Sequence, residues 1–171
     1  MTKAIFLDID GVLLPIDACT EVEVGLVRSA PMPHIDIPVS RVSKEAVDCV
    51  ANLAQRQDAR IVLISSWRYN FSLGFLFEFL RRIGLAPYLH EDWLAGFKFS
   101  SHKGHDIGFW LEDHPETTSA ILIDDHDIRN YVRCKQIIPA NPRVGLTRKD
   151  MKAAAEAFSL DALFREQAKA T

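Results

Sequence analysis

The chain has 171 residues, of which 48% are hydrophobic and 25% are charged, and its formal net charge at pH 7 is −3. These values are typical of one soluble globular domain, long enough to bury a full core. Without a basic field, the chain does not resemble a dedicated nucleic-acid-binding module, although an enzyme that acts on a nucleic-acid end remains compatible with this composition.

The cysteines and the apolar stretches indicate in which cellular compartment the protein is expected. Cys19, Cys49 and Cys134 are odd in number and far apart, so they predict neither a disulfide framework nor a zinc site. The N-terminus shows no signal-peptide pattern, and the longest apolar stretch, residues 71–80, is too short to span a bilayer. We therefore expect a cytoplasmic protein with no membrane partner.

The first predicted element is a buried strand at residues 4–7, which is followed at once by Asp8, Asp10 and Gly11. Residues two apart in a strand point to the same side, so both carboxylates can face one site. Gly11 permits a sharp turn close to a ligand. Repulsion between the two carboxylates favours a bound divalent cation such as Mg²⁺. The alternative is a strand that ends in an ordinary Asp-Gly turn.

Residues 15–39 contain four prolines and predict an irregular excursion or small flap. Beyond it, apolar runs predict strands, and helical spacing predicts helices, the first of which Ser40 or Ser43 would cap. The predicted strands are residues 60–64, 120–123 and 135–138, with a further short strand near 88–89. The predicted helices are residues 43–57, 71–83, 102–112 and 147–168.

This alternation predicts a single α/β domain over residues 1–171: a doubly wound, mainly parallel sheet with helices on both faces. Ligands bind such sheets beyond the carboxyl ends of the strands. Three of the predicted strands end in reactive side chains, and one helix begins with a lysine, so we expect these groups to share one cleft. The residues are Asp8 and Asp10, Ser65 and Ser66, Asp124 and Asp125, and Lys103.

The motifs DIDGVL, a strand ending in serine, a lysine and a strand ending in Asp-Asp occur in this order. In this, residues 3–147 resemble the haloacid dehalogenase (HAD) superfamily of phosphohydrolases. The segment ISSWR, the stretch from Lys103 to Leu111 and the late Gly145–Thr147 are more narrowly similar to the small HAD domain of bacterial RNA-repair proteins.

The resemblance implies a role for each motif residue. Asp8 would be the nucleophile that forms an aspartyl-phosphate, and Asp10 would be the general acid and base. Ser65 would hydrogen-bond the transferring phosphoryl group, although the register leaves Ser66 open. Lys103 would balance the charge of that group.

The same resemblance implies a Mg²⁺ ion held by the Asp8 carboxylate, the Asp10 backbone carbonyl and one aspartate of the later pair. We favour Asp125 as this ligand and Asp124 as the partner of Lys103, with the reverse also open. Trp67 and Arg68 follow the serine, so they could stack on a base and grip a second phosphate. A core position for Trp67 is the alternative.

The expected function is therefore a Mg²⁺-dependent phosphatase that acts through an aspartyl-phosphate on nucleic-acid or nucleotide phosphate ends. The segment at 15–39 leaves no room for a full cap domain, so a partner or a second copy could supply a lid over the phosphorylated substrate. The alternatives are a small-molecule phosphatase, such as a nucleotidase, and a catalytically silent HAD-like binding module.

Overall fold

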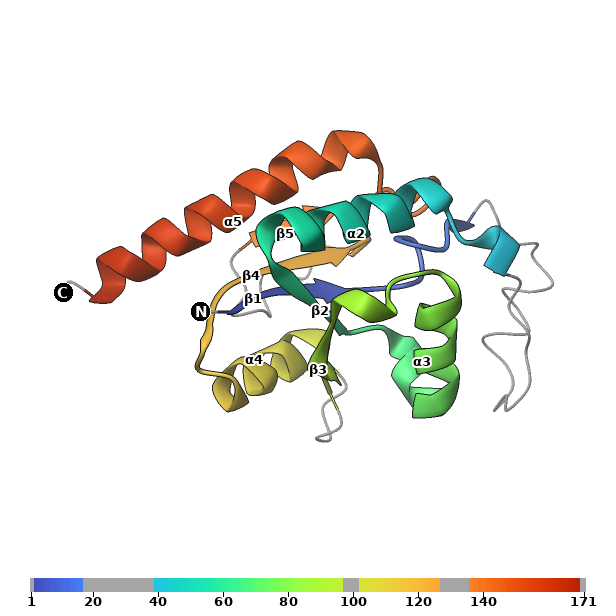
Figure 1. The fold of residues 1–171 in the computed structure, drawn as a ribbon, viewed down its shortest axis with the longest axis horizontal. Helices are drawn as coiled ribbons and strands as arrows, with labels where there is room; N and C mark the ends of the chain where they lie inside the picture. The colour runs from blue at the N-terminus through green and yellow to red at the C-terminus, as the bar shows by residue number, and fades with distance from the viewer. Residues whose placement is uncertain (1, 17–38, 97–101, 127–135, 170–171) are drawn as a thin grey trace.

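The computed structural model describes residues 2–16, 39–96, 102–126 and 136–169, with side chains as far as Phe158. Its centre is a sheet of five parallel strands in the order β3-β2-β1-β4-β5 (Figure 1). The strands are β1 (Thr2–Leu7), β2 (Ala59–Leu63), β3 (Leu89–Leu94), β4 (Thr117–Asp124) and β5 (Gln136–Pro139). The predicted α/β class is confirmed, and every strand pair is parallel.

Helices cover both faces of the sheet, as predicted. α2 (Lys44–Gln57) and α5 (Arg148–Lys169) lie above it in Figure 1, and α4 (Lys103–Asp113) lies below. α3 (Leu73–Arg82) adds its apolar side chains to the core beneath α2 and α5. Short 3₁₀ turns complete the described elements: η2 (Val39–Arg41), η3 (Ser66–Tyr69) and η4 (Ala86–Tyr88). No helix in the described ranges is long and apolar enough to cross a membrane.

Side chains of β1 alternate between two separate apolar clusters. Ile5 and Leu7 face the cluster that includes α2 and α5, whereas Ala4 and Phe6 face the smaller cluster with Ile107 of α4. Such alternation is the period of an extended strand, and a strand that is apolar on both faces is typical of a buried parallel sheet. This regular alternation also predicts toward which face of the sheet the residues directly after β1 point.

Caps account for the observed helix boundaries. Ser43, not Ser40, caps α2, because its Oγ accepts a hydrogen bond from the backbone N–H of Ala46 at 3.2 Å. Ser72 caps α3 in the same way, at 3.3 Å from the N–H of Phe75, so this helix begins later than the apolar pattern predicted. Of the predicted excursion at 15–39, residues 17–38 lie outside the described part of the chain, as do Cys19 and Cys134.

Candidate active site

The centre of the candidate site is the Lys103 ammonium, which lies between two buried carboxylates. Asp8 follows Phe6 on the α4 side of β1, and Asp124 follows Leu122 on the same side of β4. Lys103 begins α4, and its Nζ contacts Asp8 Oδ2 and lies 2.8 Å from Asp124 Oδ2. The alternation of two neighbouring strands thus brings both carboxylates to the start of one helix.

Negative charge exceeds positive charge in this cluster. Burial, together with nearby Asp124, raises the pKa of Asp8, and Lys103 opposes this effect. Burial lowers the pKa of Lys103, but Asp8 and Asp124 outweigh it, so the net direction is upward and the amine is held as an ammonium. One ammonium between two buried carboxylates leaves a deficit of positive charge that a cation can fill.

Asp10 lies beside this cluster with a different partner. Its Oδ2 accepts a hydrogen bond from the indole N–H of Trp67 at 2.9 Å. Burial, followed by the charge of Asp8, raises the pKa of Asp10 from 3.8 to about 6, and the Trp67 hydrogen bond opposes the shift. A carboxyl group with this pKa can both donate and accept a proton near neutral pH, which is what a general acid and base requires.

Asp125, the second aspartate of the pair, approaches the loop that follows β1. A Cβ placed on Gly11, whose φ is +68°, would lie 2.5 Å from Asp125 Oδ2, so only glycine fits there. The Asp125 carboxylate therefore packs against the backbone next to Asp10. Its other oxygen, Oδ1, lies 2.7 Å from Nδ1 of His126, an exposed residue that the motif analysis did not single out. Asp124, Asp125 and His126 bring one ligand atom each within 4.8 Å of one another.

The late segment Gly145–Thr147 supports the same loop from outside. Leu146 donates its backbone N–H to the carbonyl of Val12 at 3.0 Å. A Cβ on Gly145, whose φ is +78°, would lie 2.6 Å from that carbonyl oxygen. The glycine thus allows a close backbone contact that holds the turn carrying Asp10 and Gly11.

The two serines after β2 differ in exposure. Ser65 is fully buried, and its Oγ accepts the backbone N–H of Trp67 at 3.4 Å, whereas Ser66 is exposed in the first position of η3. Because the Ser65 hydroxyl lies at the end of the strand next to β1, it is the better placed of the two to reach a group bound at Asp8. A phosphate contact by either serine stays a prediction.

Arg68 has the surroundings of a structural residue, and the predicted contact with a second phosphate stays a prediction. Its guanidinium is 3% exposed and forms an ion pair with Asp106 of α4 at 2.5 Å. It also donates to the carbonyls of Ile64 at 2.6 Å and Ser65 at 2.8 Å. Arg68 therefore ties the end of β2 to the helix that carries Lys103. The sequence alone gave no sign of Asp106 as its partner.

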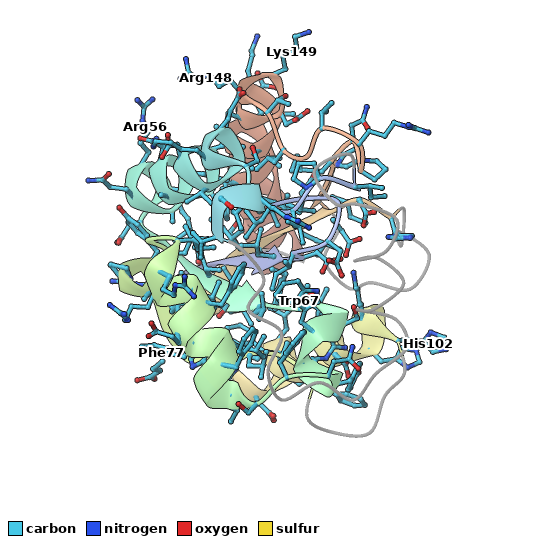
Figure 2. The ribbon with its side chains drawn as sticks, turned by 90° about the vertical axis from the view of Figure 1, so that its right-hand side faces the viewer. Arg56, Trp67, Phe77, His102, Arg148 and Lys149 are labelled. Atoms are coloured by element: carbon cyan, nitrogen blue, oxygen red, sulfur yellow. The ribbon has the colours of Figure 1, made fainter. Side chains whose placement is uncertain are left out.

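Trp67 likewise cannot stack on a nucleobase as it stands. Its side chain is 1% exposed and lies inside the molecule, whereas Phe77 and His102 lie at the periphery (Figure 2). The alternative of a core position for Trp67 is correct. Its indole N–H nevertheless reaches the site, through the hydrogen bond to Asp10 described above.

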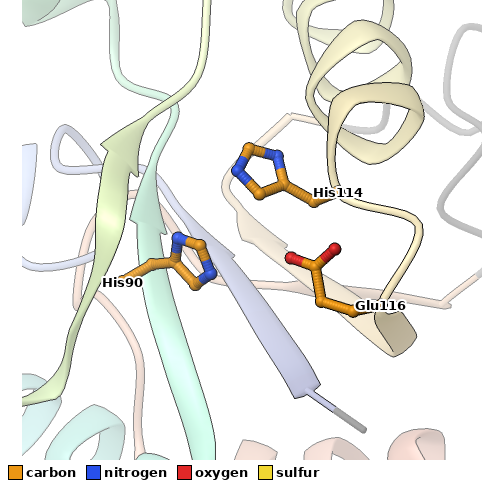
Figure 3. Close-up of side chains that lie close together, drawn as sticks. All are labelled: His90, His114 and Glu116. Atoms are coloured by element: carbon orange, nitrogen blue, oxygen red, sulfur yellow. The ribbon is translucent and has the colours of Figure 1, made fainter.

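A second group of metal-ligating residue types lies away from these strand ends, around His90, His114 and Glu116 (Figure 3). Nδ1 of His90 accepts the backbone N–H of Asp92 at 3.0 Å, so the neutral ring carries its proton on Nε2 and cannot bind a cation there. Nδ1 of His114 is 2.8 Å from the carbonyl of Trp110. This group therefore fits a structural hydrogen-bonding role better than a metal site.

Comparison with known proteins agrees with this arrangement. A family model described as "HAD domain in Swiss Army Knife RNA repair proteins" matches residues 4–151, a range that includes every residue of the candidate site. Searches of curated proteins and of solved structures found no match. The family supports a HAD-type hydrolase. The chain belongs to the family of HAD domains found in Swiss Army Knife RNA repair proteins.

Proposed function

We propose that the protein is a Mg²⁺-dependent phosphatase that uses Asp8 as its nucleophile. The observation that carries the proposal is the position of the Lys103 ammonium, in contact with Asp8 and 2.8 Å from Asp124. A carboxylate attacks an anionic phosphate only if nearby positive charge reduces their repulsion. Lys103 supplies one such charge, and the remaining excess of carboxylates calls for a second.

Each residue has a defined part in the proposed reaction. An oxygen of Asp8 attacks phosphorus while the bond to the leaving oxygen breaks, and Asp10 gives its proton to that oxygen. Asp10, now a carboxylate, then takes a proton from a water molecule that attacks the aspartyl-phosphate. The Asp8–phosphorus bond breaks, so inorganic phosphate leaves and both aspartates return to their initial states.

The residues present suit Mg²⁺. The Asp8 carboxylate, the Asp10 backbone carbonyl and Asp125 are hard oxygen donors of the kind that Mg²⁺ prefers. The contact of Asp125 with Gly11, where a Cβ would lie 2.5 Å from Oδ2, supports Asp125 rather than Asp124 as the ligand from β4. When bound, Mg²⁺ would offset the negative charge of the phosphoryl oxygens.

For the substrate class we propose phosphate ends of nucleic acids. Support comes from the family description, which refers to RNA repair proteins. A nucleoside monophosphate is the alternative substrate, and a lid from a partner chain or second copy is part of the same proposal.

Phosphate release measured with and without Mg²⁺ tests both the proposed phosphatase activity and the proposed substrate class. The substrates are an aryl phosphate, a nucleoside monophosphate, and oligonucleotides with a 3′- or 5′-phosphate, and Asp8→Asn is the blank. We expect release that needs Mg²⁺ and Asp8 and is fastest on one oligonucleotide end. Faster release from the mononucleotide would refute the substrate class only. Release no greater than the blank on all substrates would refute the phosphatase and favour a binding module.

A further inference from the structure

The indole of Trp67 makes a specific contact with a residue far away in the sequence. Its Nε1–H donates to Asp10 Oδ2 at 2.9 Å across 57 residues. Asp10 belongs to the loop after β1, and Trp67 belongs to η3, the next element after β2. The bond therefore joins the segments that follow two adjacent strands, at the edge of the sheet where the candidate site lies.

Trp67 is held rigidly enough to fix the direction of this bond. Its ring is 1% exposed and packs against Phe71, with ring centroids 5.1 Å apart, and against Phe79, with centroids 5.2 Å apart. The carbonyl of Trp67 also accepts the backbone N–H groups of Asn70 and Phe71 at 3.0 and 2.9 Å. A side chain anchored on both sides in this way has little rotamer freedom to lose when it binds Asp10.

The main chain of Trp67 reaches a second residue of the site. Its backbone N–H donates to Ser65 Oγ at 3.4 Å, and Ser65 is fully buried. One residue thus contacts Asp10 through its side chain and Ser65 through its backbone.

We propose that Trp67 is the positioning residue of the general acid Asp10, an inference that rests on the phosphatase proposed above. An indole N–H can only donate, so it occupies a lone pair of Oδ2 and favours the carboxyl proton on Oδ1. The hydrogen bond thereby selects which oxygen transfers the proton and fixes the plane of the carboxyl group. In the first step, the proton leaves Oδ1 for the departing oxygen as the Asp8–phosphorus bond forms.

This role predicts a dependence on the leaving group that loss of packing alone would not produce. An alkoxide is a poor leaving group that needs the proton, whereas p-nitrophenolate leaves without it. Trp67→Phe keeps an aromatic ring but removes the N–H donor. Because kcat/KM reports only the steps up to the departure of the leaving group, it isolates the acid role of Asp10 from its later role as a base. We expect kcat/KM to fall by about tenfold or more on an alkyl phosphate, but by less than about threefold on p-nitrophenyl phosphate.

Two variants separate positioning from packing. In an Asp10→Asn background no acid remains to be positioned, so adding Trp67→Phe should cause no further selective loss on alkyl phosphate. Phe71→Leu disturbs the packing of the Trp67 ring without removing the N–H, and we expect it to affect both substrates equally. Equal losses on both substrates with Trp67→Phe, or an undiminished loss in the Asp10→Asn background, would overturn the inference while leaving the phosphatase intact. Wild-type protein that is inactive on these two substrates and on the phosphorylated oligonucleotides would instead refute the phosphatase.

A second measurement needs no activity and covers the case in which Trp67→Phe fails to fold. The chain has three tryptophans, so three indole N–H signals are expected in a ¹⁵N-correlated NMR spectrum. At pH 8, Asp10→Asn replaces a charged acceptor by a neutral one, which should move the Trp67 signal and leave those of Trp93 and Trp110 in place. An unchanged Trp67 signal would contradict the hydrogen bond on which the inference depends.

Discussion

Two buried charge clusters lie one turn apart on α4 and differ in how their charges balance. Lys103 faces two carboxylates, those of Asp8 and Asp124, whereas Asp106 pairs with the single guanidinium of Arg68. The second cluster is neutral and also binds backbone carbonyls, which makes it a structural tie. The first keeps an excess of negative charge away from water, a costly arrangement without a cation or substrate. Unbalanced buried charge therefore distinguishes the candidate site from the structural pair on the same helix.

The largest expected effect is the loss of activity when the nucleophile is removed. Asp8→Asn removes one of the excess charges while keeping the shape of the side chain. We expect phosphate release to fall by about 10³-fold or more, because no covalent intermediate can form. Circular dichroism and thermal melting should show a fold at least as stable as that of the wild type. A variant that keeps a tenth of the activity would contradict the role of Asp8.

Removing one charge of the balanced pair, Arg68 and Asp106, should lower the stability of the fold. Arg68→Met leaves Asp106 buried without its partner, and we expect a loss of about 3–5 kcal/mol in the free energy of unfolding. The double variant Arg68→Met/Asp106→Leu removes both charges and should recover most of that loss. Urea unfolding curves measure both. If the double variant is no more stable than Arg68→Met alone, the pair is not the tie that we describe.

Asp10→Asn should raise stability in a pH-dependent way. The pKa of Asp10 is about 6 in the folded protein against 3.8 in the unfolded chain, so the wild type loses stability as pH rises between these values. The Asp10→Asn variant does not lose this stability, because its amide carries no charge at any of these pH values. In metal-free buffer we expect the variant to be more stable than the wild type by about 1–2 kcal/mol at pH 7.5, and by little at pH 4. Urea unfolding at both pH values tests this, and an equal difference at both would contradict it.

The smallest effect is expected at an exposed ion pair, which serves as a control for charge removal. Lys44 and Asp48 lie 2.8 Å apart on α2, with side chains 86% and 52% exposed. Lys44→Ala should change the free energy of unfolding by less than about 0.5 kcal/mol and leave phosphate release unchanged. A larger loss of stability would mean that burial does not explain the difference between this exposed pair and the buried charge clusters on α4.

The sequence predicted most strands of the sheet well, but it predicted the edge strand β3 less well. Buried parallel strands are apolar on both faces, so residues 4–7, 60–64 and 120–123 stood out as continuous runs. β3 pairs with only one neighbour, and its sequence LHEDWL mixes exposed charges with buried positions. Only residues 88–89 were therefore predicted as a strand, whereas the strand covers Leu89–Leu94.

The candidate site, too, could be predicted from the sequence only in part. Asp8 directly follows β1 and Asp124 is the last residue of β4, so the topology alone brings both to one edge of the sheet. The alternation of Leu122 and Asp124 could also have assigned Asp124 to the side of Lys103. Contacts between distant segments were beyond sequence reasoning. Nothing in the spacing connects Trp67 with Asp10, and the same holds for Arg68 and Asp106.

The central claim is that a phosphoryl group passes through Asp8, and chemical trapping tests it most directly. The protein is mixed with Mg²⁺ and its best substrate, quenched, and reduced with borohydride, which converts an aspartyl-phosphate into homoserine. Peptide mass spectrometry then locates the change. We expect homoserine at position 8, and none in Asp8→Asn. Turnover with no change at position 8, or with the change at another aspartate, would contradict the account.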